Sequence, residues 1–259
     1  AGSDFASLQT RAVEDGDYFV INGQKVWTSY AHQAQRCILV VRTDPNAPKH
    51  KGLSYLLVDM KTPGITVRPL VQITGDAEFN EVFFEEVRVP KANLLGEKNQ
   101  GWQVAVTTLM FERVNFDILY QLEPMLQQLA ELAKRIRING HTAAEDPSVR
   151  QQLAQFHIES QALKYNGFRQ LTRQLRGDPP GPEGSISKLT GTELHLRMAH
   201  FATEMLGPFG QVALGETHGL DNGYWSRRAL TSRLYTIAGG TSEVMRNIIG
   251  DRVLALPKG

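Results

Sequence analysis

The acidic side chain best suited to chemistry is Glu112, in the segment "LMFERVNFDIL". Leu109, Phe116 and Leu119 define one stripe of a predicted helix, and Glu112 falls inside that stripe. Burial penalises the charged form of a carboxylate and raises its pKa toward the range in which a general base works. An ion pair with Arg113, or a helix rotated so that Glu112 meets water, explains the pattern equally well. The pattern alone leaves these alternatives open.

A second candidate is the segment "AGGTSE", in which Gly239 and Gly240 precede Thr241. Adjacent glycines are kept where the chain needs a positive φ or where something lies against the main chain. Thr241 and Ser242 can cap the following helix, whose first free N–H groups can bind an anion or a carbonyl. A tight turn with an ordinary cap is the alternative. We expect positive φ and a helix cap here under either interpretation.

A third candidate is Trp27, which lies near the end of a predicted strand and is followed by Thr28 and Ser29. An indole can stack on a planar cofactor while a hydroxyl bonds the edge of its ring. A large aromatic residue in the core is the alternative. The seven histidines show no metal-ligand spacing, and His195 and His200 are five residues apart, which suits no common helical metal pair. We therefore expect no metal site.

Composition excludes several classes of partner. The chain has 259 residues, with 28 Lys and Arg against 27 Asp and Glu, so bulk charge attracts neither nucleic acid nor an anionic membrane. No window reaches the ~20 apolar residues of a membrane span. The single cysteine, Cys37 in "CILVV", excludes an internal disulfide and is expected to be a small buried apolar residue. We expect a cytoplasmic protein, or a mitochondrial matrix protein in a eukaryote.

The elements that position these residues divide into two halves. Asn22-Gly23 predicts a hairpin turn in "DYFVINGQKVW". Later helices are predicted from Pro147 to Arg176, and from an N-cap at Ser185 to Gly207. We expect an α+β fold with an antiparallel, barrel-like β-domain over residues 1–97 and an up-and-down four-helix bundle over residues 98–259. The other predicted strands are "CILVVRT", "LSYLLVDM", "GITVRPLVQI" and "EVFFEEVRVP".

Four segments in order resemble the signatures of the acyl-CoA dehydrogenase family. They are "AGSD" (1–4), "INGQKVWTS" (21–29), "GWQVAVTTLMFERV" (101–114) and "GGTSEVMRNIIGDRVL" (239–254). The family fold is an N-terminal helical domain, a central β-domain and a C-terminal four-helix bundle. The resemblance begins at the β-domain, so we expect the N-terminal helical domain to be missing from this chain.

The resemblance implies FAD held between the β-domain and the bundle, and oxidation of an acyl-CoA thioester to the trans-2-enoyl-CoA, as in fatty acid β-oxidation. It implies that Trp27 lies against the flavin, that Ser29 bonds near its reactive nitrogen, and that Ser3 lies close to both flavin and thioester. Arg113 would meet the CoA chain, and an electron-transfer flavoprotein would take the electrons. The implied cofactor-binding residues are Gly2, Ser3, Trp27, Thr28, Ser29, Gly240, Thr241 and Glu243.

The resemblance also identifies the expected base. Most members carry Tyr-Glu-Gly-Thr in the C-terminal signature, with Glu as the base, whereas this chain has Ala238, Gly239, Gly240 and Thr241. A minority place the base on the long bundle helix just before an arginine, which is the position of Glu112. We expect Glu112 to be catalytic, and the N–H of Gly239 to polarise the thioester carbonyl.

A second departure concerns the flavin phosphates and the assembly. Family members usually carry Arg-x-x-Phe-Gly at the second bundle helix, where the arginine holds the FAD pyrophosphate of a neighbouring subunit. This chain reads "INGHTAAEDPSVRQQLAQF" there, and Arg150 lies too far along to substitute. We expect a homo- or hetero-oligomer, a dimer or a tetramer. A non-catalytic subunit that completes a partner's flavin site is the main alternative function, and a flavin oxidase or monooxygenase is the third.

Overall fold

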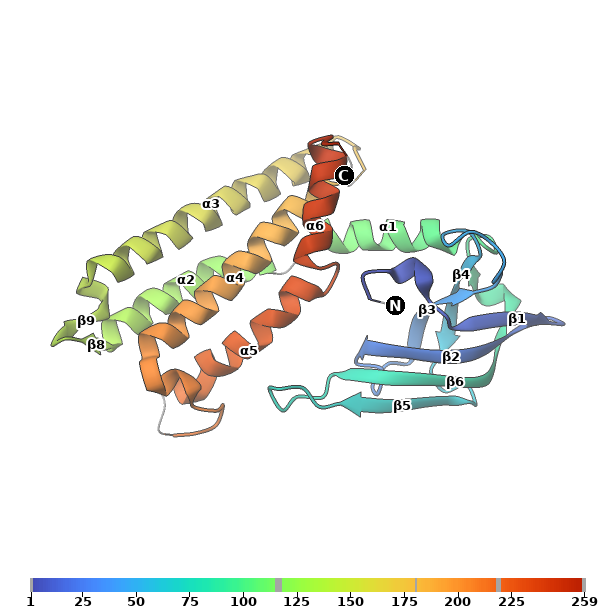
Figure 1. The fold of residues 1–259 in the computed structure, drawn as a ribbon, viewed down its shortest axis with the longest axis horizontal. Coiled ribbons are helices and arrows are strands. Elements are labelled where there is room, and N and C mark those ends of the chain that lie inside the picture. The colour runs from blue at the N-terminus through green and yellow to red at the C-terminus, as the bar shows by residue number, and fades with distance from the viewer. Residues whose placement is uncertain (1, 115–117, 180, 218–219, 258–259) are drawn as a thin grey trace. The chain divides into compact units, whose positions relative to one another are not determined.

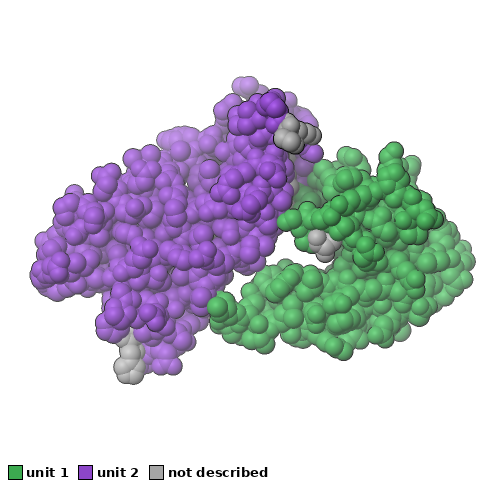
Figure 2. Space-filling view, viewed as in Figure 1, with its two compact units in different colours: residues 1–109 green, residues 110–259 purple. Residues whose placement is uncertain are grey.

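The computed structural model describes residues 2–114, 118–179, 181–217 and 220–257, with no side chain described from residue 112 to residue 119. The chain forms two compact units, residues 1–109 and 110–259, coloured separately in Figure 2. Each unit is considered by itself. The domain boundary expected from the sequence, between residues 97 and 98, stays a prediction.

Unit 1 is built on one seven-stranded sheet with the order β5-β6-β2-β1-β3-β4-β7 (Figure 1). Neighbouring strands are antiparallel except β1 and β3, which pair in parallel through Arg11 and Arg42. Because the chain reverses once between β1 and β2 and again between β2 and β3, β3 runs in the direction of β1. The strands are β1 (Arg11–Asp15), β2 (Tyr18–Ser29), β3 (Arg36–Arg42), β4 (Leu53–Asp59), β5 (Ile65–Leu70), β6 (Phe79–Pro90) and β7 (Leu94–Leu95).

The predicted hairpin turn at Asn22-Gly23 is wrong, because β2 runs straight through these residues and the actual turn is Gly16-Asp17. At this point β6 carries one more residue than β2, which makes a β-bulge. The Asn22 amide spans the bulge, accepting from the N–H of Glu86 at 3.0 Å and donating to its carboxylate at 2.6 Å. Asn22 therefore bonds a bulge on the neighbouring strand instead of forming a turn.

The first helix, α1 (Gly101–Val114), begins against the sheet. A Cβ on Gly101 would lie 2.6 Å from the backbone carbon of Ser54 in β4, so only glycine allows this approach. One turn later Ala105 is buried in a small core cluster with Leu53 and Tyr55. The first half of α1 therefore belongs to unit 1.

Unit 2 is a helical bundle in which α4 packs against α2, α3, α5 and α6 (Figure 1). Its core is formed mainly by Leu, Met and Ala side chains of α2 and α4, closed by Phe156 and Trp225. The short hairpin β8 (Arg137–Ile138) and β9 (His141–Thr142) joins α2 to α3. The helices are α2 (Ile118–Arg135), α3 (Pro147–Leu175), α4 (Gly184–Leu206), α5 (Tyr224–Ile237) and α6 (Ser242–Ile248). Short helical turns cover Phe5–Ser7, Lys91–Asn93, Ala143–Glu145, Gly207–Gln211, Leu220–Gly223 and Ile249–Val253.

The predicted helix boundaries agree with these bounds except at the start of α4. The predicted start of α3 at Pro147 is confirmed, and the Asp146 carboxylate caps it by accepting from the N–H groups of Ser148 and Val149. The predicted N-cap at Ser185 is wrong, because the backbone is already helical at Glu183 and the hydroxyl of Ser185 is buried inside the first turn. Helices α1 and α2 lie on either side of residues 115–117, which are outside the described residues.

Replacing Gly23 by Ala is expected to destabilise unit 1 by about 2–4 kcal/mol. Gly23 has a φ of 144°, and an added Cβ would lie 2.8 Å from the Cα of Thr10. The matched control is Gly16→Ala, at a φ of 56° with no described atom within 4 Å of the Cβ position, which should cost only about 1–2 kcal/mol. Urea denaturation measures both, and equal losses would contradict the close approach of Thr10.

Candidate functional site

In unit 1, Trp27 is held outside the core by a second irregularity of β2. The pairing of β2 with β6 shifts between Lys25 and Thr28, and Trp27 has a φ of 62°. Its side chain is 63% exposed, and the indole meets the ring of Phe79 edge-on at 6.2 Å between centroids. The alternative that Trp27 is a core aromatic is therefore wrong. The indole presents a planar apolar surface to a ligand.

The backbone beside Trp27 is fixed by a buried asparagine. Asn80 is fully buried and donates to the carbonyl of Thr28 at 2.9 Å, and its own carbonyl lies 3.1 Å from Nδ1 of His32. Ser29 is exposed at the end of β2, as are Gly2 and Ser3 near the start of the chain. Sequence reasoning missed Asn80; its signal was a polar residue at an inward position of an apolar strand.

A cavity of about 240 Å³ lies beside Thr28 within unit 1. It is lined mainly by apolar side chains, together with Lys25 and Cys37. Burial lowers the pKa of Lys25 to about 8 and raises the pKa of Cys37 to about 11. A thiol with so high a pKa stays protonated and unreactive at neutral pH, which fits the expected apolar role of Cys37, although the residue is partly buried and not buried as expected.

In unit 2, the turn before α6 has the predicted conformation. Gly239 and Gly240 have φ values of 68° and 108°, and the Thr241 hydroxyl caps α6 by accepting from the N–H of Val244 at 3.3 Å. A Cβ on Gly240 would lie 2.6 Å from Cε of Met245. No described atom lies within 4 Å of the same position on Gly239. The turn is therefore crowded at its second glycine and open at its first.

Two charged side chains of α4 hold this turn in place. Lys188 is fully buried and donates to the carbonyl of Gly240 at 2.5 Å, and Glu193 accepts from the hydroxyl of Ser242 at 2.5 Å. The N–H of Glu243 itself, at the start of α6, and the Thr241 hydroxyl lower the pKa of the Glu243 carboxyl. The sequence analysis missed Lys188 and Glu193. A lysine in a helix that is buried on most sides was the available signal that a buried charge holds a neighbouring segment.

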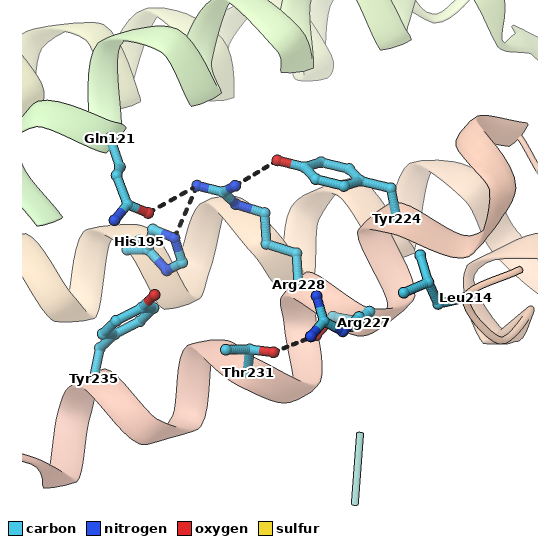
Figure 3. Close-up of a pocket in the computed structure, with 8 residues that line it drawn as sticks. All are labelled: Gln121, His195, Leu214, Tyr224, Arg227, Arg228, Thr231 and Tyr235. Atoms are coloured by element: carbon cyan, nitrogen blue, oxygen red, sulfur yellow. Dashed lines mark hydrogen bonds between the residues drawn. The ribbon is translucent and has the colours of Figure 1, made fainter. Parts of the chain in front are cut away.

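A polar pocket of about 170 Å³ lies within unit 2, between α2, α4 and α5. Figure 3 shows the guanidinium of Arg228 at its centre. Its Nη1 donates to the hydroxyl of Tyr224, and its Nη2 lies 3.4 Å from Oε1 of Gln121 and 3.2 Å from Nε2 of His195. The lining residues are Gln121, His195, Leu214, Tyr224, Arg227, Arg228, Thr231 and Tyr235.

His195 is a neutral histidine in this pocket. It is 1% exposed, and burial together with the charge of Arg228 lowers its pKa to about 4. A guanidinium only donates, so Nε2 of His195 accepts and the ring proton sits on Nδ1. That Nδ1 is buried and has no hydrogen-bond partner in the described part of the chain, and the same holds for Nε of Arg228. The pocket therefore holds two unsatisfied donors.

The expected catalytic and CoA-binding residues of α1 lie where side chains are not described. The backbone at Glu112 and Arg113 is helical, and both side chains are outside the described residues. The roles of Glu112, Arg113 and Gly239, and of the cofactor-binding residues, stay predictions. No cluster of three His, Cys, Asp or Glu side chains that could hold a metal is found in the part of the chain that the structure describes. None of its described helices is long and apolar enough to cross a membrane.

The neutral state of His195 predicts a pH-dependent stability for unit 2. The unfolded chain binds a proton to this residue below about pH 6.5, whereas the folded chain does so only below about pH 4. Stability is therefore complete above pH 6.5 and is lost as the pH falls toward 4, by up to about 3 kcal/mol. The His195→Gln variant should lack this part of the pH dependence. Denaturation at pH 7 and pH 4.5 measures it, and parallel losses in both proteins would contradict a neutral His195.

Comparison with known proteins covers both units. The model of the acyl-CoA dehydrogenase middle domain matches residues 1–87, and that of the C-terminal domain matches residues 99–254. Acyl-CoA dehydrogenase IpdE1 of Mycobacterium tuberculosis strain H37Rv is 41% identical over 269 residues, covering 100% of this chain and 65% of that protein. The chain thus spans less than two thirds of the length of this relative.

Two solved structures have the same fold. The Tcur3481-Tcur3483 steroid ACAD has a TM-score of 0.89 at 31% identity, covering 100% of this chain and 66% of that one. A chain of the ChsE4-ChsE5 complex from Mycobacterium tuberculosis has a TM-score of 0.88 at 33% identity, with 100% and 67% covered. The chain belongs to the acyl-CoA dehydrogenase family, whose members are FAD-dependent oxidoreductases.

Proposed function

We propose that the protein containing this chain is an FAD-dependent acyl-CoA dehydrogenase that converts an acyl-CoA thioester to the trans-2-enoyl-CoA. The observation that carries the proposal is the turn before α6. Its backbone is held by Lys188, its helix cap is Thr241, and its first glycine leaves open space where most family members carry an acid. A chain that binds the thioester at this turn needs its base elsewhere.

The residues present fit a flavin. The exposed, planar indole of Trp27 and the adjacent hydroxyls of Thr28 and Ser29 offer a stacking surface and hydrogen-bond partners. In unit 2, considered by itself, Thr241 and the N-terminus of α6 offer hydroxyl and N–H donors to a cofactor. When bound, FAD supplies the acceptor for the hydride that leaves the β-carbon of the substrate.

The chain's own residues would remove the α-proton. The N–H of Gly239 would donate to the thioester carbonyl and stabilise the negative charge that develops on its oxygen, which makes the α-proton more acidic. The Glu112 carboxylate would then accept that proton. Arg113 would meet the CoA chain, and Ser3 would lie near the thioester. An electron-transfer flavoprotein is the proposed electron acceptor.

The acyl group is proposed to be larger than a short straight chain. One matched structure is named as a steroid ACAD. We extend to this chain only the large size of the acyl group that this name indicates. In this chain the polar pocket follows α5 away from the turn that would bind the thioester. A short acyl group would leave that pocket unused. We propose a cytoplasmic location, as expected from the sequence.

The protein is proposed to work as an oligomer. One side of α3 exposes an apolar stripe, which a soluble monomer rarely leaves uncovered. One matched structure is the ChsE4-ChsE5 complex, and this chain lacks the family's Arg-x-x-Phe-Gly clamp. Both observations favour a second, different subunit. The stripe is formed by Ile158, Tyr165, Phe168, Leu171 and Leu175, each more than half exposed.

Replacing Glu112 by Gln is expected to lower the rate of flavin reduction by an acyl-CoA by at least about 100-fold, because the base is lost while the flavin stays bound. Adding Gly239→Glu should restore part of the rate, because the space there is open, although the φ of 68° strains any residue other than glycine. The matched control is Glu123→Gln, an exposed acid of α2, which should leave the rate unchanged. Stopped-flow spectroscopy and α-proton exchange measure the effect. Retained exchange in Glu112→Gln would exclude Glu112 as the base.

The stripe on α3 predicts the subunit contact. The double variant Phe168→Glu, Leu171→Glu should lower the oligomeric state, because two charges would be buried in the interface. Gln151→Glu, at an exposed polar position of the same helix, should leave it unchanged. Light scattering measures the oligomeric state and tests the proposed interface. Counting FAD per chain, with and without the product of a neighbouring gene, tests the proposed enzyme function. Flavin missing from both preparations would contradict the proposed dehydrogenase. An unchanged oligomeric state in the double variant would contradict the proposed interface.

A further inference from the structure

We propose that the pocket around Arg228 binds a carboxylate at the far end of the acyl group, so that the substrate is an acyl-CoA with a second, distal acid. This inference rests on the proposed function and names its substrate class. The evidence for it is the charge, the geometry and the position of the pocket, and the pocket lies within unit 2.

Among the described residues, the hydrogen-bond partners of Arg228 include no acid that could balance its charge. These partners are a tyrosine hydroxyl, a glutamine carbonyl and a neutral imidazole. The Tyr224 hydroxyl in turn donates a hydrogen bond to another neutral group, Oε1 of Gln128, at 3.2 Å. A partly buried guanidinium surrounded by neutral acceptors favours an anionic ligand, because desolvation of the cation is then offset by a charge-assisted bond. Arg227 also lines the pocket.

One side of the guanidinium has few hydrogen-bond partners among the described residues. Nη1 is engaged by Tyr224, whereas Nη2 has only contacts of 3.2 and 3.4 Å and Nε is buried with no partner. Nε and Nη2 form the side of the guanidinium that donates two parallel hydrogen bonds to one carboxylate. The Nδ1–H of His195 is a third donor in the same pocket without a partner.

The position of the pocket sets the length of the acyl group. Tyr235 lines it four residues before Gly239, and Arg228 lies nine residues before Ile237, the last residue of α5. At 1.5 Å per residue, Arg228 is about 14 Å along the helix axis from the end of α5. An acyl group that reaches from the turn to Arg228 must therefore span about that distance.

An alkyl end is a poor ligand for this pocket. It offers no acceptor to Nε of Arg228, which is already buried, and an unsatisfied buried donor costs about 1–3 kcal/mol. A carboxylate seated on the guanidinium would give Nε of Arg228 an acceptor. The pocket thus discriminates for a distal acid, and against a plain alkyl group of the same length.

The test compares matched CoA esters on the holoenzyme, expressed from its complete reading frame with any subunit that it requires. One series carries plain acyl groups, and the other carries the same chains ending in a carboxylate, from about eight to twelve carbons to match the ~14 Å span. Calorimetry gives the dissociation constants, and flavin reduction gives kcat/KM. The wild type should prefer the carboxylate series by about 10- to 100-fold, and the preference should weaken at high salt.

The variants assign this preference to Arg228. Arg228→Met should remove most of the preference for the carboxylate series. Arg228→Lys keeps the positive charge but loses the two parallel donors of the guanidinium, so it should retain only part of that preference. The matched control is Arg233→Met, an exposed position of the same helix, which should keep the full preference. Thermal unfolding checks that each variant is folded. If Arg228→Met does not fold, Arg228→Lys alone tests whether the preference depends on Arg228.

The outcomes separate this inference from the proposed function. Flavin reduction by both series with no preference in the wild type, or a preference that survives in both variants of Arg228, would overturn the distal-acid site and leave the dehydrogenase intact. If neither series binds or reduces the flavin, the proposed function itself fails, and the inference fails with it.

Discussion

The hydrogen bond from the ammonium of Lys188 to the carbonyl of Gly240 is the interaction on which the candidate site in unit 2 depends. Lys188 is fully buried, and a buried cation is tolerated only where its protons find acceptors. The bond fixes the turn to α4, the helix at the centre of the bundle. The left-handed glycines and the cap at Thr241 lie on either side of that carbonyl, and the Ser242–Glu193 bond ties the start of α6 to the same helix.

The same helix supplies the second polar centre of the unit. His195 lies seven residues after Lys188, two helical turns along α4, and it faces α5 at Arg228. The turn that would hold the thioester and the pocket proposed for the distal acid are therefore both anchored on α4. A helix buried on most sides can carry such groups because neighbouring elements satisfy most of their hydrogen bonds. The spacing between the two centres is then set by the helix itself.

Sequence reasoning predicted what depends on local chemistry. The two halves, the start of α3, the cap at Thr241 and the positive φ at Gly239 and Gly240 all follow from residue type and near neighbours. It failed at Asn22, where a turn dipeptide bonds a bulge on a strand more than 60 residues away. It also missed Asn80, Lys188 and the polar pocket, because each depends on which residue of a distant element lies opposite. No local pattern encodes that pairing.

Trp27 illustrates a position where stability and function oppose each other. A bulky aromatic at a φ of 62° costs about 1–2 kcal/mol relative to glycine or asparagine, and its exposed indole regains little of that by packing. Packing within the fold therefore does not account for a tryptophan at this position. Any effort to make this protein more heat-resistant by substitution at strained positions should leave Trp27 alone, because its exposed indole belongs to the proposed flavin site.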